Sequence, residues 1–280
     1  MAEAQNILTE LRGAVGIITI ARPERFNSLD VKTAQDLRRA GLQMARDATV
    51  RAVILAGQPG VFCSGADLKY VREHGEPDDL GYLKPEEAAS AASYGEAFKQ
   101  ILEYIHSTIS EIRRAPKPFI AAVDGIAAAG GFGLAMACDL VVASERASFE
   151  WAYGKTGLTG AESSTFFLPR LIGMRKALEL VFLNPRLTAE EAIRLGLINR
   201  VFPVESLDAE ARKLAEQLAA GPVRAWSVAK SLLNLADGGD RLDVHLDQEL
   251  ESLTRIAEGD EFAEGLDGFL GKRPPRFPGK

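Results

Sequence analysis

Residues 119–143, FIAAVDGIAAAGGFGLAMACDLVVA, predict a strand, a glycine turn, the start of a helix and a second strand in one nearly charge-free run. Small residues occupy the turn: Ala127, Ala128, Ala129, Gly130, Gly131 and Gly133. Where glycine and alanine replace bulkier residues, the backbone can approach a ligand or another backbone closely. A helix that opens after such a turn presents unpaired N–H groups, which suit a carbonyl or an oxyanion. Tight packing of a buried helix would use the same residues, so the stretch alone leaves both interpretations open.

The whole chain has the composition of a soluble globular protein. Its 280 residues are 46% hydrophobic and 26% charged, which allows one large domain or a main domain with a helical appendage. The net charge of −6 is spread along the chain and is not the basic footprint of a nucleic-acid-binding protein. Asp124 and Asp139 interrupt the apolar stretch and argue against a membrane span. Without a targeting pattern, we expect a cytoplasmic protein that binds neither nucleic acid nor membrane.

Cysteine and histidine usage predicts neither a disulfide nor a metal site. Cys63 and Cys138 lie far apart in apolar contexts, so we expect both to be buried and reduced. The three histidines, His74, His106 and His245, have no spacing typical of metal ligands.

The segments before the opening stretch extend an α/β pattern. Residues 7–12 and 15–20 predict a β-hairpin that turns at Gly13, and Asp30 is the predicted N-cap of an amphipathic helix. Residues 52–56 predict a buried strand, which is followed by a glycine-containing loop. Because strand, loop and helix recur with fully apolar strands, we expect a sheet covered on both faces.

Most of the other segments are predicted to be helical. Residues 72–92 predict a polar excursion of the kind that often covers a binding site, and residues 93–114 predict a long amphipathic helix. A further helix is expected to begin near Ser163, and Thr188 opens a capping-box pattern. Residues 197–202 form the last predicted strand.

The predicted division of the chain falls at residue 203. Residues 1–203 would form the α/β core, and residues 204–280 a helical region with a proline-rich tail. The C-terminal helices have too little apolar surface for a core of their own, so we expect them to pack on the core or on neighbouring subunits.

Four stretches, in this order, resemble the crotonase (enoyl-CoA hydratase/isomerase) family: ARPERFNSL at 21–29, VFCSGADL at 61–68, AAVDGIAAAGGFGLAMACDLVVAS at 121–144 and AEEAIRLGLINRVFP at 189–203. The resemblance covers residues 7 to 272. It implies an α/β spiral of ββα units with a C-terminal helical trimerisation region, and a homotrimer or a dimer of trimers. It also implies an acyl-CoA thioester substrate and no separate cofactor, because coenzyme A is part of the substrate.

The resemblance gives the small residues of the opening stretch a chemical role. Family chemistry passes through a thioester enolate or a related oxyanion held by two backbone N–H groups, which the motifs place at Ala66 and Gly130. A donor of this kind stabilises a transition state by about 2.7–4 kcal/mol.

The resemblance also implies residues that contact coenzyme A. Two loops supply most of them, several through backbone atoms: Arg25, Phe26, Ser64, Asp67, Leu68 and Lys69. Phe269 and Lys272 match the place where a neighbouring subunit of the family offers an aromatic side chain and a lysine.

The chain departs from the family's hydratases at both acid/base positions. Where those enzymes have two glutamates, this sequence has Gly133 and Tyr153. Glycine has no proton to transfer, and tyrosine, with an ordinary pKa near 10, is a poor base but a possible hydrogen-bond donor. A two-glutamate hydration mechanism therefore does not follow from the sequence.

Glu162 is the carboxylate that could substitute. Some family isomerases and the 4-chlorobenzoyl-CoA dehalogenases place a catalytic carboxylate at the position of Ala161, one residue earlier. A one-residue shift at a helix start rotates a side chain by about 100°, so the loop would have to adjust. A glutamate stabilised by the helix dipole is the structural alternative. Glu150 is a weaker candidate, because strand alternation would turn it outward.

His106 matches the general-base histidine of the dehalogenase branch, although a packed helical histidine fits its neighbours equally. Three hypotheses follow. The first is an acyl-CoA enzyme, a lyase or an isomerase of fatty-acid-type metabolism, that stabilises an enolate. The second is a dehalogenase-like or thioester hydrolase that uses Glu162 and His106. The third is a non-catalytic acyl-CoA-binding protein.

Overall fold

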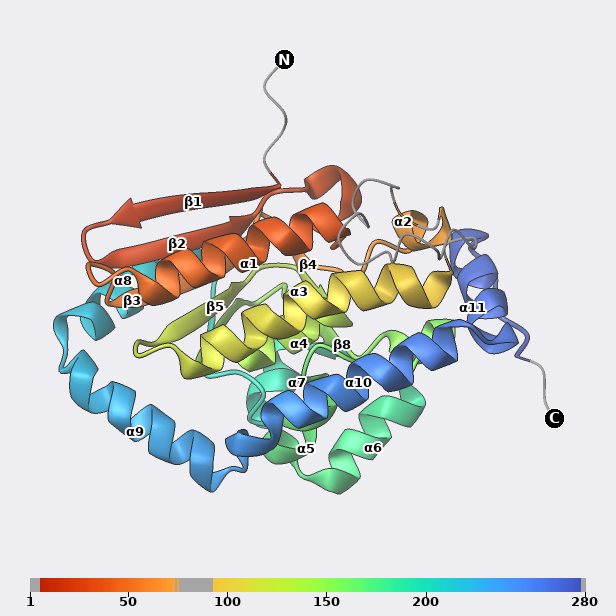
Figure 1. The fold of residues 1–280 in the computed structure, drawn as a ribbon. Coiled ribbons are helices and arrows are strands. Elements are labelled where there is room, and N and C mark those ends of the chain that lie inside the picture. The colour runs from red at the N-terminus through yellow and green to blue at the C-terminus, as the bar shows by residue number, and fades with distance from the viewer. Residues whose placement is uncertain (1–5, 74, 76–92, 278–280) are drawn as a thin grey trace, which may run out of the picture.

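The computed structural model describes residues 6–73, 75 and 93–277. Most of the excursion predicted for residues 72–92 lies outside the described residues. The described chain folds into two sheets wrapped by helices, with α3 and α10 lying side by side across the front in Figure 1.

The larger of the two sheets has six strands and is called the base sheet. The β1–β2 pair is the predicted antiparallel hairpin, and the other neighbours in this sheet are parallel. In spatial order, its strands are β1 (Ile7–Arg12), β2 (Val15–Ile20), β3 (Ala52–Gly57), β5 (Phe119–Val123), β7 (Leu140–Ser144) and β10 (Arg200–Phe202). The last strand is shorter than predicted, because Leu197 still belongs to the turn that ends α7, where its N–H donates to the carbonyl of Ala192.

A smaller four-stranded sheet carries the turns that follow the base strands. Its spatial order is β4 (Val61–Cys63), β6 (Ile126–Ala128), β8 (Ser148–Glu150) and β9 (Arg186–Thr188). Three times the chain passes from the six-stranded sheet into this one, in the pairs β3–β4, β5–β6 and β7–β8. The repeat is the predicted succession of two strands and a helix, and it brings the loops after β4, β6 and β8 together.

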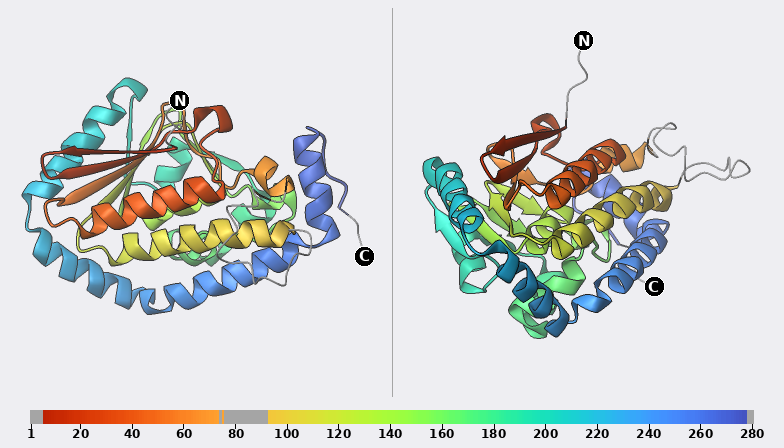
Figure 2. Two further views of the ribbon diagram at one scale, coloured as in Figure 1. Left: turned by 45° about the horizontal axis from the view of Figure 1, so that its top comes forward. Right: turned by 60° about the vertical axis from the view of Figure 1, so that its left-hand side comes forward.

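Alternating side chains of the base sheet supply two separate cores. Val53 and Leu55 of β3 point into the main core with helices α1 and α3, whereas Ile54 between them packs with α8 on the opposite face. The sheet is therefore covered on both faces, as expected (Figure 2).

The α-helices within the described residues pack around these two sheets. They are α1 (Val31–Arg46), α2 (Leu68–Arg72), α3 (Tyr94–Arg114), α4 (Gly130–Ala137), α5 (Ser164–Ile172), α6 (Met174–Leu183), α7 (Ala189–Arg194), α8 (Leu207–Ala220), α9 (Val223–Ala236), α10 (Leu242–Ala257) and α11 (Asp260–Leu270), with short 3₁₀ turns η1 (Pro23–Arg25), η3 (Tyr153–Thr156), η4 (Val204–Ser206) and η5 (Gly239–Arg241).

The predicted helix starts are confirmed. Asp30 accepts a hydrogen bond from the N–H of Thr33 at the start of α1, and Ser93 does the same for Glu96 at the start of α3. The capping box at Thr188 is present at the start of α7.

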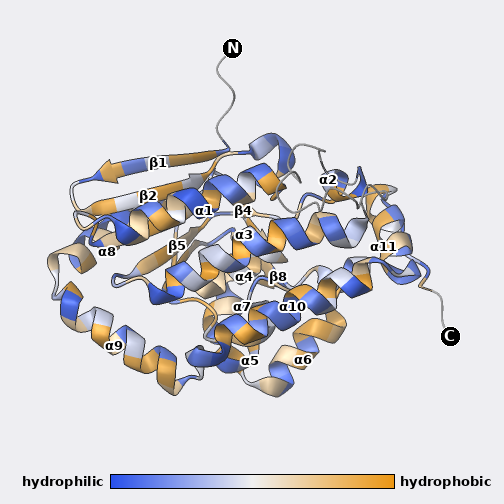
Figure 3. Cartoon of the chain, viewed as in Figure 1, coloured by the Kyte–Doolittle hydropathy of each residue, from blue (hydrophilic) through white to orange (hydrophobic). Residues whose placement is uncertain are grey.

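The C-terminal helices pack on the core in different ways. Helix α8 covers the base sheet, and α10 lies along α3. Helix α9 carries an exposed apolar row, visible in Figure 3: Val228, Leu232, Leu233 and Leu235. The division at residue 203 and the oligomerisation of this region remain predictions. Across the described residues, we find no helix long and apolar enough to cross a membrane.

Candidate functional site

The carboxyl ends of three parallel strands meet at one edge of the smaller sheet. β6 lies between β4 and β8 and is parallel to both, so the loops after all three open on the same side. Ligand sites in α/β proteins commonly occur at such an edge. These loops contain Ala66, Gly130 and Tyr153, which the sequence had singled out from three separate motifs.

A cavity of about 240 Å³ opens at this edge. Apolar side chains from α3, α10 and α11 complete its wall, opposite the loops. Its lining consists of Ser64, Ala66, Leu68, Phe98, Ile126, Ala128, Ala129, Glu150, Ala152, Tyr153, Lys155, Thr156, Leu158, Glu162, Arg186, Leu253 and Phe269.

The loops that carry Ala66 and Gly130 are in direct contact. Ala66 is held in a bridge to Leu29, and the preceding Gly65 adopts a φ of +91°. A Cβ on Gly65 would lie 2.8 Å from the Cβ of Ala129 and 3.1 Å from the nitrogen of Gly130. Only glycine permits both this φ and this approach, so the sequence brings the two predicted oxyanion donors to one place.

Helix α4 begins at Gly130, directly after Ala128 and Ala129, which line the cavity. Its N-cap, Ala129, has a φ of +46°, and no side-chain cap is present within the described residues. The helix interior approaches the neighbouring strand so closely that a Cβ on Gly131 would clash with the carbonyl of Cys63. The small residues therefore allow close packing, and they also begin a helix that has no side-chain cap among the described residues. Binding of an oxyanion at this helix start remains a prediction.

Glu162 reaches the cavity from the turn before α5. Its side chain is almost fully buried, at 2% exposure, and its backbone has a φ of +50°. The carboxyl group lies against Gly130, where an added Cβ would be 2.7 Å from its Oε1 atom. The left-handed backbone supplies the adjustment that the one-residue shift from Ala161 requires.

The backbone of Glu162 also fills the space beside Gly133. A Cβ at that position would lie less than 3.0 Å from the carbonyl oxygen of Glu162 and 2.9 Å from its Cβ. A glutamate at position 133 and this conformation of Glu162 therefore exclude each other.

Tyr153 is the hydrogen-bond donor to Glu162. Its hydroxyl donates to Oε2 of Glu162 and lies 3.1 Å from the carbonyl oxygen of Ala161. Burial and the neighbouring Glu162 raise the pKa of Tyr153 well above its usual value, so the phenol remains neutral. Burial raises the pKa of Glu162 to about 7, although the Tyr153 hydrogen bond acts in the opposite direction.

His106 lies behind Glu162 rather than in the cavity wall. Its Nε2 accepts a hydrogen bond from the backbone N–H of Glu162 at 3.3 Å. Burial, with a smaller contribution from His245, lowers the pKa of His106 to about 3, so the ring is neutral. The structure thus joins His106 to Glu162 through the backbone, and its action as a general base stays a prediction.

Glu150 corrects one expectation from strand alternation. Its side chain is buried and lines the cavity instead of facing outward. Lys155 and Arg186 form ion pairs with it, the latter at 3.2 Å from the opposite position on β9. The four-stranded sheet is covered on this face by the η3 turn, so a residue on the outer side of β8 is still enclosed.

The predicted coenzyme A contacts divide into two groups. Ser64, Leu68 and Phe269 line the cavity. Phe269 does so within its own chain, whereas the resemblance implied a neighbouring subunit; α11 folds back on η3, which brings it there. The other five are not among the residues that line the cavity: Arg25, Phe26, Asp67, Lys69 and Lys272.

Asp67 has a structural role that is visible in its contacts. It accepts hydrogen bonds from the N–H groups of Lys69 and Tyr70 at the start of α2, and it pairs with Arg22 at 2.8 Å and Arg25 at 3.4 Å. Phe26, next to Arg25 in the chain, is 65% exposed. Contact of these residues with coenzyme A remains a prediction.

Sequence reasoning missed Glu249 on α10. This carboxylate is buried and accepts a hydrogen bond from the N–H of Ser163 at 2.7 Å. Leu246 and Leu253, three and four residues away, mark the buried face of the helix. A glutamate on that face was a readable signal, because isolated buried carboxylates are rare.

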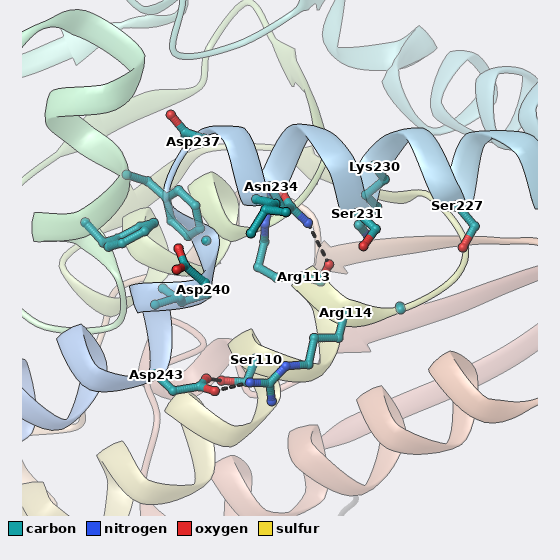
Figure 4. A pocket seen from close by; sticks show the side chains of 16 residues that line it. Ser110, Arg113, Arg114, Ser227, Lys230, Ser231, Asn234, Asp237, Asp240 and Asp243 are labelled. Atoms are coloured by element: carbon teal, nitrogen blue, oxygen red, sulfur yellow. Dashed lines mark hydrogen bonds and ion pairs between the residues drawn. The ribbon is translucent and has the colours of Figure 1, made fainter.

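A second cavity of about 340 Å³ lies between α3, α9 and α10, and Figure 4 shows its lining. Arg114 pairs with Asp243, which also accepts from Ser110 at 2.7 Å. Arg113 and Asn234 bind each other through side chain and backbone. Arg113, Arg114 and Asp243 thus each have a polar partner within this lining. Cys63 and Cys138 are buried free thiols, and the described part of the chain contains no cluster of potential metal ligands.

The sequence pattern of the Enoyl-CoA hydratase/isomerase family matches residues 10–280. The chain belongs to the enoyl-CoA hydratase/isomerase family. Among relatives of this family, the chain is 33% identical over 276 residues to the 1,2-epoxyphenylacetyl-CoA isomerase of Escherichia coli strain K12, covering 98% of each chain. It is 30% identical over 267 residues to 4-chlorobenzoyl coenzyme A dehalogenase-2 of Arthrobacter sp, covering 95% of this chain and 91% of that one.

A solved structure of the enoyl-CoA hydratase/isomerase family agrees with the fold. An enoyl-CoA hydratase from Mycobacterium avium subsp. paratuberculosis K-10 superposes with a TM-score of 0.84 at 28% identity, covering 99% of this chain and 100% of the other. The recognised resemblance and the predicted fold class are therefore confirmed, and the chain is an enzyme of this family.

Proposed function

We propose that this enzyme is an isomerase that moves a double bond in an enoyl-CoA thioester, with Glu162 as the only proton carrier. The observation that carries the proposal is the placement of the buried Glu162 carboxyl group, with a pKa of about 7, beside Gly130 in the cavity. The other carboxyl group in the lining, Glu150, is held in ion pairs with Lys155 and Arg186. A general base is most effective when its pKa lies near the working pH.

The proposed reaction conserves every atom of the substrate. The Glu162 carboxylate removes a proton from the α carbon of a 3-enoyl thioester, and the C–H electron pair moves into the thioester carbonyl. The resulting enolate oxygen accepts hydrogen bonds from the N–H groups of Ala66 and Gly130. Protonated Glu162 then returns the proton to the γ carbon, which leaves the conjugated 2-enoyl thioester and a free carboxylate.

Tyr153 supports this cycle as a hydrogen-bond donor to Glu162. Because the phenol stays neutral, it stabilises the carboxylate that begins the reaction and does not compete for the substrate proton. The apolar wall formed by Phe98, Leu158 and Leu253 suits a hydrocarbon or aromatic acyl group.

Hydration is disfavoured by the same residues. Addition of water needs a second acid/base group, and Gly133 and Tyr153 occupy the two positions where the hydratases have glutamates. The space beside Gly133 is filled by the backbone of Glu162, which leaves no room there for a further carboxylate.

A dehalogenase-like or hydrolytic reaction is the second candidate. The similarity to the Arthrobacter dehalogenase favours it, with Glu162 as a nucleophile. Against it, the Nε2 atom of His106 already accepts a hydrogen bond from the backbone N–H of Glu162, and His106 is not among the residues that line the cavity. We further propose that the enzyme is a homotrimer or a dimer of trimers. The loops at Arg25–Phe26 and Ser64–Lys69 would bind coenzyme A.

The test compares thioesters with the purified enzyme. We expect 3-enoyl-CoAs to be converted to conjugated 2-enoyl-CoAs, with deuterium incorporation at the transferred position in D₂O. Glu162→Gln, which keeps the shape of the side chain, should lower kcat by about 10²–10⁴-fold. Release of halide or free acid would select the second candidate, and thioester binding without any turnover would select the non-catalytic hypothesis. Full isomerase activity of Glu162→Gln would overturn the role of that residue.

A further inference from the structure

A carboxylate from α10 binds the start of α5, the helix that follows Glu162. Glu249 accepts hydrogen bonds from the N–H of Ser163 through Oε2 at 2.7 Å and from the N–H of Thr165 through Oε1 at 3.0 Å. The hydroxyl of Thr165 also donates to Oε1. The N-cap Ser163 provides no side-chain cap itself, so a residue 86 positions later in the chain caps this helix.

Two consecutive backbone N–H groups, those of Glu162 and Ser163, donate hydrogen bonds to side chains from two different helices. His106 of α3 accepts from the N–H of Glu162, and Glu249 of α10 accepts from the N–H of Ser163. The two holding side chains approach each other, with 3.9 Å between Nε2 of His106 and Oε2 of Glu249. Both are buried, so water does not replace either of them.

The backbone of this turn needs such support. Glu162 and Ser163 have φ values of +50° and +63°, and neither is glycine. Left-handed conformations of non-glycine residues persist only where the surroundings hold them, and they concentrate at functional sites. Release of the turn would carry the Glu162 carboxyl group away from Gly130, because side chain and backbone rotate together.

We propose that Glu249, together with His106, is a positioning residue that holds the strained Glu162–Ser163 turn and thereby aims the Glu162 carboxyl group at the cavity. The hold on the turn follows from hydrogen bonds within this chain and does not depend on which reaction the enzyme catalyses. The effect of that hold on catalysis rests on the proposed isomerase function.

Glu249 also acts on Glu162 through its charge. The titratable groups that face Glu162 are Tyr153 from η3, Cys63 from β4, His106 from α3 and Glu249 from α10. Beyond Glu249 lies His245, near Arg170 of α5. Burial and Glu249 both raise the pKa of Glu162. Neutralising Glu249 should therefore lower the pH at which Glu162 loses its proton.

The decisive variant is Glu249→Gln, with Glu251→Gln on the exposed face of the same helix as its matched control. We expect Glu249→Gln to lower kcat by about 10–100-fold, the scale of a small misplacement of a reacting group, while KM changes less than about threefold. The acid limb of the kcat profile should move to lower pH. Glu251→Gln should match the wild type in both.

A second pair of variants keeps the test decisive if Glu249→Gln does not fold. Glutamine at position 106 can still accept the N–H of Glu162 through its amide oxygen, whereas leucine cannot. We expect His106→Gln to keep kcat within about threefold and His106→Leu to lose about 10–100-fold. Equal activity of these two variants, or wild-type kcat and pH profile for Glu249→Gln, would overturn the proposal.

One readout does not depend on turnover. Carbon-13 NMR of glutamate-labelled protein, with Glu162→Gln for assignment, follows the ionisation of the Glu162 carboxyl group directly. A lower midpoint in Glu249→Gln than in the wild type and Glu251→Gln is expected, and an unchanged midpoint contradicts the electrostatic coupling. If no acyl-CoA is turned over by the wild type, the proposed function fails, while this titration still decides whether Glu249 acts on Glu162.

Discussion

Two buried helices begin at the same cavity, and their N-termini are treated in opposite ways. Helix α4 starts at Gly130 with no side-chain cap within the described residues, whereas the start of α5 is bound by the carboxylate of Glu249. A buried helix start attracts negative charge because its first N–H groups lack partners. The protein supplies its own anion to α5 and leaves α4 to the substrate oxygen of the proposed reaction.

Strain accompanies both helix starts. Ala129 precedes α4 with a φ of +46°, and Glu162 and Ser163 precede α5 with positive φ values as well. The two turns also contact each other, since Glu162 lies against Gly130 and Gly133 of α4. The uncapped start of α4 and the capped start of α5 therefore pack directly against each other. Substitutions at the residues in contact can test how far each helix start depends on the other.

Gly133→Ala should have the largest effect, because it forces the two turns apart. The new Cβ would meet the carbonyl oxygen of Glu162, a backbone atom that cannot move alone. Overpacking of this kind costs about 3 kcal/mol, which corresponds to roughly 6–12 °C in Tm for a chain of this size. Thermal unfolding measures it, with Gly154→Ala, whose Cβ has ordinary space, as the control. A Tm equal to that of the control would show that the turns are independent.

Gly130→Ala tests the open helix start with the fold retained. Its Cβ would meet only the end of the Glu162 side chain, at 2.7 Å from Oε1, which can swing aside. We expect Tm to stay within about 3 °C and kcat to fall by about 10²–10³-fold, because the carboxyl group and the oxyanion donor are both disturbed. Steady-state kinetics decide the matter. Unchanged kcat would remove Gly130 from the proposed oxyanion site.

The two buried carboxyl groups should make stability fall as the pH rises. The pKa of Glu162 and that of Glu249 are each raised by burial to about 7, from an ordinary value of 4.5. Between these values the folded protein binds more protons than the unfolded chain, so the free energy of unfolding decreases as the pH rises from about 4.5 to about 7.

Denaturant unfolding at several pH values measures this slope. Glu162→Gln should flatten it by up to about 1 kcal/mol per pH unit, and Glu251→Gln should leave it unchanged. In activity, kcat/KM should increase with pH through about 7, because the carboxylate form of Glu162 is the proposed base. An identical slope in Glu162→Gln and wild type would contradict the raised pKa.

Ser163→Gly should have the smallest effect and the opposite sign. Glycine adopts the φ of +63° without strain, and the substitution removes a buried hydroxyl that has no partner among the described residues. We expect a gain of up to about 1 kcal/mol in the free energy of unfolding, with kcat within about threefold. Ala129→Gly at the open helix start is the matched change. A loss of stability in Ser163→Gly would contradict the strain inferred from the positive φ of Ser163.

Local signals in the sequence predicted much of the fold. The hairpin at residues 7–20, the Asp30 helix cap, the long helix after residue 93 and the Thr188 capping box all depend on neighbours within a few residues, and all are present. The family resemblance added the order of the units. Ala66 and Gly130 came from motifs in separate strand–loop units, and the parallel pairing of β4 with β6 explains why they meet.

Long-range contacts explain what the sequence could not provide. The burial of Glu150 depends on the η3 turn that covers β8, and the cap on α5 comes from Glu249, 86 residues beyond Ser163. The positive φ of Glu162 was equally hidden, because no glycine marks it. Such features arise from tertiary packing, which overrides local preference at functional sites.

The space beside Gly133 has a consequence for the history of this enzyme. Since Glu162 occupies that space, no single substitution can add the first hydratase glutamate to this chain. The Glu162 turn would have to move as well, so laboratory evolution toward hydration would need to change the turn before α5.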